Sequence, residues 1–114
     1  MIGPCLQLRA QIRHLQAQRR SLESKLMQPQ SLRAGSIVER YLRSGGAARA
    51  RPAYYLSRSQ QGRSKLTYVK KEELLALQRQ CSAYRAFQQN LKTWRQLTVS
   101  LQHCWKQLQQ AQSQ

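Results

Sequence analysis

The sequence predicts an α+β protein in which two long helices form an antiparallel coiled-coil hairpin with a small antiparallel β-sheet inserted between them. Apolar residues recur every three or four positions near both ends of the chain, and this is the period of a buried helix face. The middle of the chain instead has short runs of β-branched and aromatic residues separated by turn signals, a pattern typical of strands. A length of 114 residues suits a single domain, 1–114.

The first helix is expected over residues 4–28. Pro4 suits a first helical turn, and Pro29 stops the helix because it cannot donate a backbone hydrogen bond. Arg19 occupies one position of an otherwise apolar heptad seam, which consists of Cys5, Leu8, Ile12, Leu15, Leu22 and Leu26.

The insert is expected over residues 31–70 as a three-stranded sheet. Residues 55–59 and 63–69 are predicted to be the arms of a β-hairpin, because Ser59-Gln60-Gln61-Gly62 forms a turn signal between them. A short strand is expected beside them around Ile37 and Val38. The segment between Arg43 and Arg51, which contains Gly45-Gly46, is expected to be a flexible basic loop.

The second helix is expected over residues 71–112, with Glu72 and Glu73 in its first turn. Its seam contains one extra three-residue step and is made of Leu74, Leu77, Cys81, Tyr84, Phe87, Leu91, Trp94, Thr98, Leu101, Trp105 and Leu108. Leu74, Leu77 and Cys81 are expected to form the floor on which the sheet sits. Trp94 and Trp105 are interpreted as core or subunit-interface residues rather than as a ligand cage.

The charge balance excludes several classes of function. Lys and Arg number 20 against four acidic residues, all Glu, so the formal net charge is +16. A two-metal nuclease needs clustered carboxylates, and this chain has too few for that or for an acid/base pair. No catalytic residue and no enzyme activity are therefore expected. Such a charge calls for an acidic partner, of which nucleic acid is the commonest.

Three scattered cysteines indicate a reducing compartment, and the chain has no secretory signal and no apolar run long enough to span a membrane. These features predict a cytoplasmic protein associated with the nucleoid or with a ribonucleoprotein. An antiparallel stalk could bring Cys5 near His103 and Cys104, but their spacing matches no structural zinc pattern. No metal and no cofactor are expected.

Half of the basic residues lie between positions 33 and 71. Arginine, the commoner of the two types, favours planar contacts with phosphates or guanine edges; the alternative is a merely solvated charged surface. Tyr41, Tyr54, Tyr55 and Tyr68 are interleaved with the cations and could stack on bases. Because strand side chains alternate, one of Tyr54 and Tyr55 should instead pack as core. The candidate nucleic-acid-binding residues are Arg33, Arg40, Arg43, Arg49, Arg51, Arg58, Arg63, Lys65, Lys70, Lys71, Tyr54 and Tyr55.

Residues 33–95 resemble a family of small proteins of unknown function found in bacteria, archaea and their mobile elements. The motifs that carry the resemblance are residues 35–41 (GSIVERY), 52–57 (PAYYLS), 65–72 (KLTYVKKE) and 84–87 (YRAF). Many family members carry a cysteine cluster like a zinc knuckle between the first two motifs. Residues 43–51 contain no cysteine here and are basic instead. The resemblance implies the fold and a mobile-element context rather than an activity.

The sequence thus predicts a non-enzymatic nucleic-acid-binding accessory protein of a mobile element or a ribonucleoprotein. The expected ligand is DNA, slightly favoured over structured RNA, and backbone recognition is expected because no sequence-reading motif is present. A larger mobile-element or ribonucleoprotein enzyme and a second copy of the chain are further partners to expect, and a membrane is not. The alternative is a coiled-coil adaptor whose basic face binds an acidic protein.

Overall fold

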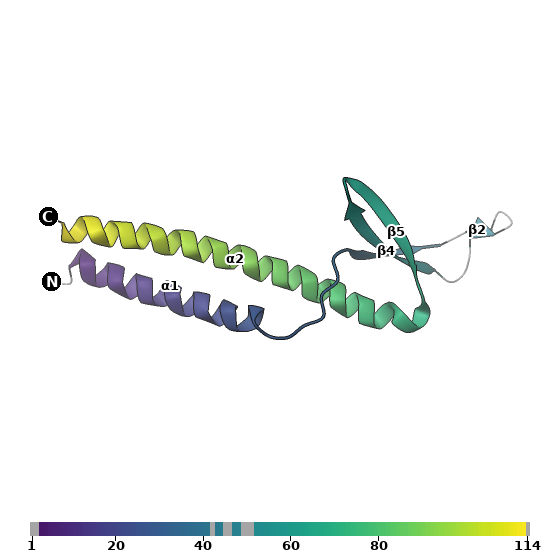
Figure 1. Cartoon of the computed structure of the whole chain (residues 1–114), viewed down its shortest axis with the longest axis horizontal. Coiled ribbons are helices and arrows are strands. Elements are labelled where there is room, and N and C mark those ends of the chain that lie inside the picture. Colours follow the sequence, from purple (N-terminus) through teal and green to yellow (C-terminus); the bar gives the residue numbers. More distant parts are fainter. Residues whose placement is uncertain (1–2, 42, 45–46, 49–51, 114) are drawn as a thin grey trace. The chain divides into compact units, whose positions relative to one another are not determined.

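The computed structural model describes residues 3–41, 43–44, 47–48 and 52–113. The chain divides into two compact units: residues 1–29 with 87–114, and residues 30–86. The second helix contributes to both units, so each unit contains a helical part of the chain (Figure 1). Two helices and a small antiparallel sheet make the protein α+β, as the sequence predicts, and the sheet lies between the helices in sequence.

The first unit is built from α1 (Pro4–Leu26) and the C-terminal part of α2 (Leu74–Gln112). Pro4 begins α1 directly after Gly3, and the helix ends at Leu26, two residues before the predicted end. Met27 and Gln28 close its last turn by donating backbone hydrogen bonds to Glu23 and Lys25. Pro29 then prevents further helix because its nitrogen carries no hydrogen.

Side-chain contacts between α1 and α2 follow an antiparallel order. Arg9, near the start of α1, donates a hydrogen bond to Gln112 at the end of α2, whereas Arg19 donates to Thr98 at 3.5 Å. Between these two contacts lies a buried cluster that joins the helices, made of Ile12, Leu101, Cys104 and Leu108, with Cys5, Leu8 and Leu15 packed against it. The apolar seam of α1 is therefore buried over its first half.

The predicted seam of α2 is wrong at Trp105. This residue is 50% exposed, and its neighbour Cys104 is buried instead. The buried line instead takes a three-residue step from Leu101 to Cys104 and a four-residue step from Cys104 to Leu108, which reverses the order of the predicted steps. The Cys104 thiol packs with Ile12 of α1 and with Leu101 and Leu108 of α2.

The second unit contains a three-stranded antiparallel sheet in the order β1-β4-β5. Its strands are β1 (Ser36–Arg40), β4 (Ala53–Gln60) and β5 (Arg63–Val69). The predicted hairpin is confirmed: Gln61 and Gly62 join β4 to β5 with φ values of 51° and 77°. Positive φ at both central residues is the conformation of a type I′ turn, whose twist matches that of the flanking strands.

A further pair of two-residue strands, β2 (Arg43–Ser44) and β3 (Ala47–Ala48), forms a separate antiparallel ladder. The prediction of a flexible loop is therefore wrong for these four residues. The sequence between them, Gly45-Gly46, is one that tight hairpins favour.

The sheet packs on the first turns of α2. Leu56 and Val69 are buried together with Cys81, and the residues packed around these three are Ile37, Tyr54, Leu74 and Leu77. The predicted floor of Leu74, Leu77 and Cys81 is thus confirmed. The backbone nitrogen of Arg33 adds a hydrogen bond to the carbonyl oxygen of Gln80 at 3.2 Å.

The second helix begins slightly later than predicted. Residues 71–73 form a short 3-10 helix, and regular α-helix starts at Leu74 and continues to Gln112. Among the described residues, neither helix combines the length and the apolar character needed to cross a bilayer.

Gly35 occupies a backbone position that only glycine accommodates. Its φ is 121°, and a Cβ atom there would lie 2.5 Å from the carbonyl oxygen of Ser57. Gly62 also has positive φ, but a Cβ atom there would meet nothing within 4 Å.

We therefore expect Gly62→Ala to cost about 1 kcal/mol of folding stability from backbone strain alone. Gly35→Ala should cost more than about 3 kcal/mol because the clash adds to the strain. Hydrogen exchange of the β4 and β5 amides measures both; equal protection in the two variants would contradict the clash.

The position of the α2 seam is tested by two substitutions. Leu101→Ala removes a side chain that is 2% exposed and should lower the free energy of unfolding by about 2–5 kcal/mol. Trp105→Ala removes a larger but half-exposed side chain and should cost about 1 kcal/mol. Urea denaturation followed by circular dichroism measures both, and a larger loss for Trp105→Ala would place the indole in the core.

Candidate nucleic-acid interface

The tip of the β4–β5 hairpin is a two-stranded ribbon. β1 pairs with β4 only as far as Ser57, whereas β4 and β5 continue to pair up to Gln60 and Arg63. The ribbon contains three cations of the candidate set, Arg58, Arg63 and Lys65, of which Arg58 and Lys65 are direct cross-strand partners. The base of the hairpin is thus part of a three-stranded sheet, and its charged end continues as two strands.

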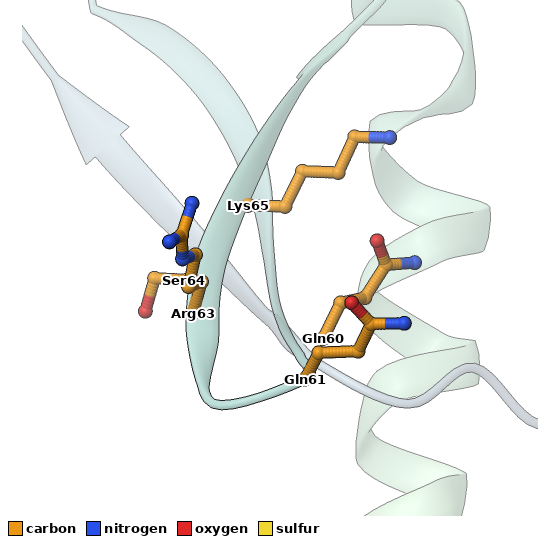
Figure 2. A pocket seen from close by; sticks show the side chains of 5 residues that line it. All are labelled: Gln60, Gln61, Arg63, Ser64 and Lys65. Atoms are coloured by element: carbon orange, nitrogen blue, oxygen red, sulfur yellow. The ribbon is translucent and has the colours of Figure 1, made fainter.

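The ribbon presents polar side chains on both of its sides. Figure 2 shows Lys65, Gln60 and Gln61 extending from one side of the hairpin, and Ser64 and the Arg63 guanidinium lying on the other. The same five residues line an open hollow of about 700 Å³ at the turn. Arg63 and Lys65 are exposed, so their charged groups are accessible to a ligand.

Arg58 is held more closely than the other ribbon cations. It is only partly exposed, and its Cγ lies 3.0 Å from where a Cβ atom of residue 35 would stand. The absence of a side chain at Gly35 therefore leaves room for the aliphatic part of Arg58. In this way the glycine of the first motif positions a cation of the ribbon.

The cations of the insert are not neutralised by carboxylates within the described part of the chain. The ion pair found there joins Arg19 to Glu23 within α1, at 3.9 Å. Glu39 accepts a hydrogen bond of 2.9 Å from the Tyr41 hydroxyl rather than from a cation. This hydrogen bond, together with the negative charge of Glu39, raises the pKa of Tyr41 above its ordinary value. The positive charge of the insert is therefore available for an external anion.

The adjacent tyrosines Tyr54 and Tyr55 separate to opposite faces of the sheet, as strand alternation predicts. Tyr54 packs against the buried cluster over α2. Tyr55 lies on the other face, paired in register with Val38 and Tyr68. Its ring makes an edge-to-face contact with that of Tyr68, with centroids 5.8 Å apart. Tyr54 is therefore partly buried against the cluster over α2, whereas Tyr55 and Tyr68 share the other face.

The remaining described candidates lie outside the ribbon. Arg33 precedes β1, Arg40 ends it, and Lys70 and Lys71 follow β5; all four side chains are exposed. The backbone of Arg43 belongs to β2, whereas Arg49 and Arg51 lie outside the described residues. The ribbon is thus the place where the structure brings the largest group of candidates together.

Sequence reasoning left out Gln60 and Gln61, which line the hollow beside Arg63 and Lys65. Both belong to the predicted turn signal Ser59-Gln60-Gln61-Gly62, which was the available signal, because residues at a hairpin turn share its tip. Within the described residues, no three His, Cys, Asp or Glu side chains come together as metal ligands.

The family model "Domain of unknown function (DUF6788)" matches residues 12–80, more than half of the chain. The matched region contains part of α1, the whole sheet and the first turns of α2, and it starts and ends earlier than the resemblance seen in the sequence. No curated protein and no solved structure matches the chain significantly.

The contact between Tyr41 and Glu39 predicts a pH dependence. In Glu39→Gln, the pKa of Tyr41 should fall back toward about 10, because the carboxylate charge that favours the neutral phenol is removed. Because folding raises the pKa of Tyr41, the contact stabilises the folded protein fully at pH values below the ordinary tyrosine pKa. This stabilisation is lost as the pH rises through the raised pKa. NMR titration of labelled tyrosine rings measures the change, with Tyr41→Phe identifying the resonance. An unchanged pKa in Glu39→Gln would exclude the contact.

Proposed function

The chain belongs to the DUF6788 family, and we propose that it is a non-enzymatic protein that binds the phosphate backbone of nucleic acid. The observation that carries the proposal is the ribbon: Arg58, Arg63 and Lys65 lie within a few residues of a hairpin turn, with no carboxylate partner among the described residues, in a chain of net charge +16. Such cations release condensed counterions when they contact phosphates, and this release is a major source of affinity.

The shape of the ribbon favours duplex DNA slightly over structured RNA. The major groove of B-DNA is wide enough for a two-stranded β-ribbon, whereas that of A-form RNA is deep and narrow. Arg63 and Gln60 form the last pair before the turn. The arginine guanidinium can donate hydrogen bonds to base edges, and the glutamine amide can both donate and accept them. Phosphate contacts by Arg58 and Lys65 would then position the ribbon, with Arg33, Arg40, Lys70 and Lys71 adding charge beside it.

The helices are proposed to form an antiparallel coiled-coil hairpin that presents the sheet. The antiparallel order of contacts in the first unit supports this arrangement. The resemblance noted in the sequence suggests an accessory role in a mobile element or a ribonucleoprotein, and docking on a larger enzyme or on a second copy belongs to that role. An intracellular, nucleoid- or ribonucleoprotein-associated location follows from the proposed ligand.

A second candidate function is a coiled-coil adaptor that binds an acidic protein. The exposed indole of Trp105 favours it, since Trp105 lines a hollow of about 310 Å³ together with Arg9, Arg13 and Leu108. Aromatic and arginine side chains are the usual anchors of protein interfaces. The adaptor would use the first unit, whereas nucleic-acid binding would use the ribbon.

Salt dependence of DNA affinity tests the proposal. We expect the affinity of the full chain for a duplex to fall with a log-log slope of roughly −5 to −9, which corresponds to about six to ten phosphate contacts. The variant Arg58→Gln, Arg63→Gln, Lys65→Gln should flatten the slope by about 2–3, because each lost contact removes close to one released counterion. Fluorescence anisotropy between about 50 and 200 mM salt measures both slopes.

The matched control removes the same charge from the first unit, in Arg20→Gln, Arg95→Gln, Lys106→Gln, whose side chains are exposed. Its slope should change by less than about 1. Equal effects of the two triple variants would show that net charge rather than the ribbon binds DNA. A slope near zero for the full chain would overturn the proposal and favour the adaptor.

A further inference from the structure

The face of the sheet turned away from α2, called here the open face, has an unusual composition. The helix-packed side contains Ile37, Tyr54, Leu56 and Val69, so strand alternation places the intervening residues on the other side. In register across the three strands, those residues are Ser36, Val38, Arg40, Ala53, Tyr55, Ser57, Ser59, Ser64, Leu66 and Tyr68.

Two tyrosine rings dominate the open face. Tyr55 and Tyr68 are direct cross-strand partners and contact each other edge to face, with an interplanar angle of 75°. Tyr68 is 63% exposed although it lies within a strand rather than in a loop. Tyr55 is partly buried and supports its neighbour from one side. The contact therefore fixes the Tyr68 ring while leaving much of its surface uncovered.

The side chains that surround the two tyrosine rings on the open face are mostly shorter than the rings. Most of the other residues of the open face are serine or alanine, whose side chains are too short to cover an aromatic ring. Leu66, 38% exposed, and Val38 continue the apolar surface next to the tyrosines. A planar group that approaches the sheet can therefore lie against Tyr68.

The charge around the rings selects the kind of planar group. None of the ten residues of the open face is acidic, and Arg40, at the end of β1, is exposed on this face. Lys71 and Tyr68 both line a hollow of about 370 Å³ beside the end of β5, which Tyr54, Val69 and Leu74 of the helix-packed side also line. A second hollow that Tyr68 lines contains both Arg33 and the carboxylates of Glu72 and Glu73. Glu39 lies on the opposite side by alternation, where its carboxylate accepts the hydrogen bond from Tyr41.

An exposed ring beside Arg40 and Lys71 matches the chemistry of unpaired nucleotides, in which each base offers a π-face and each phosphate a negative charge. A protein partner would be expected to cover a larger continuous apolar surface than two tyrosines, a leucine and a valine among serines. The positive charge and the absence of acidic residues on this face also favour nucleic acid over a protein of ordinary composition.

We propose that the open face stacks unpaired bases on Tyr68, so that the ligand of this protein is a nucleic acid with a single-stranded segment. This inference rests on the proposed function and adds a second site to it. Arg58 and Lys65 belong to the helix-facing side by register, so the stacking site and the cation pair at the base of the ribbon lie on different sides of the sheet. Arg40 and Lys71 would hold the phosphates of the stacked segment.

The experiment compares the affinity of the full chain for three probes: oligo(dT), oligo(U) and a blunt DNA duplex with the same number of phosphates. Tyr68→Leu should weaken binding to both single strands about 10-fold and leave duplex binding within about twofold, because stacking on an aromatic ring requires an unpaired base. Tyr68→Phe, the matched control, keeps the ring and should bind all three probes like the original chain.

A photochemical experiment locates the contact directly. Oligonucleotides containing 5-iodouracil form crosslinks on irradiation with aromatic side chains that stack on the modified base. Mass spectrometry of the crosslinked peptides should identify Tyr68 or Tyr55. Crosslinks found only at the ribbon or in the helices would overturn the proposal.

The remaining outcomes separate this inference from the proposed function. If Tyr68→Leu leaves single-strand affinity unchanged, or weakens all three probes equally, base stacking is wrong, although phosphate binding by the ribbon stands. If the original chain binds none of the probes at about 50 mM salt, the proposed function itself fails. If Tyr68→Leu instead converts a dimer into a monomer in sedimentation, with single-strand affinity unchanged, the open face is a contact between copies and the stacking proposal is overturned.

Discussion

The alternation of side chains along β4 is the constraint on which the rest of the second unit depends. β4 is the central strand, and it places Leu56 and Tyr54 in the cluster over α2. The residues between them, Tyr55 and Ser57, must therefore lie on the other face. A shift of one residue would exchange the two faces along the whole strand. The packing of Leu56 and Tyr54 on α2 thus decides which side chains of β4 lie on the face turned away from the helix.

The register of β4 also determines where the cations lie. β1 ends its pairing at Ser57, so Arg58 is the first residue of the two-stranded ribbon, and the turn at Gln61-Gly62 brings Lys65 opposite it. Gly35 contributes from outside the sheet, because its missing side chain makes space for Arg58. Gly35, Gly62 and the register of β4 and β5 together hold three cations close to one another, so their positive charges repel. A polyanionic ligand would relieve that repulsion, which is the physical basis of the proposed function.

Prediction from the sequence was most successful where a local period sufficed. Both helices, the β4–β5 hairpin and the floor of Leu74, Leu77 and Cys81 follow from apolar spacing and turn residues. The predicted seam of α2 was wrong at Trp105, because an indole and a thiol are both apolar enough for a buried position, and only packing with Ile12 of α1 shows that Cys104 occupies it. The β2–β3 ladder was missed because two residues per strand carry no detectable alternation.

The sequence by itself determined the charge of this protein, its helix and strand content, and its shortage of carboxylates. It also showed that one of Tyr54 and Tyr55 had to be buried, but not which one. Only the tertiary structure decided that Tyr54 packs on α2, that Tyr55 meets Tyr68 across the sheet, and that Arg58 and Lys65 share the ribbon. The reason is physical: composition and period are properties of the chain, whereas cross-strand partners and the buried face depend on which distant segments exclude water together.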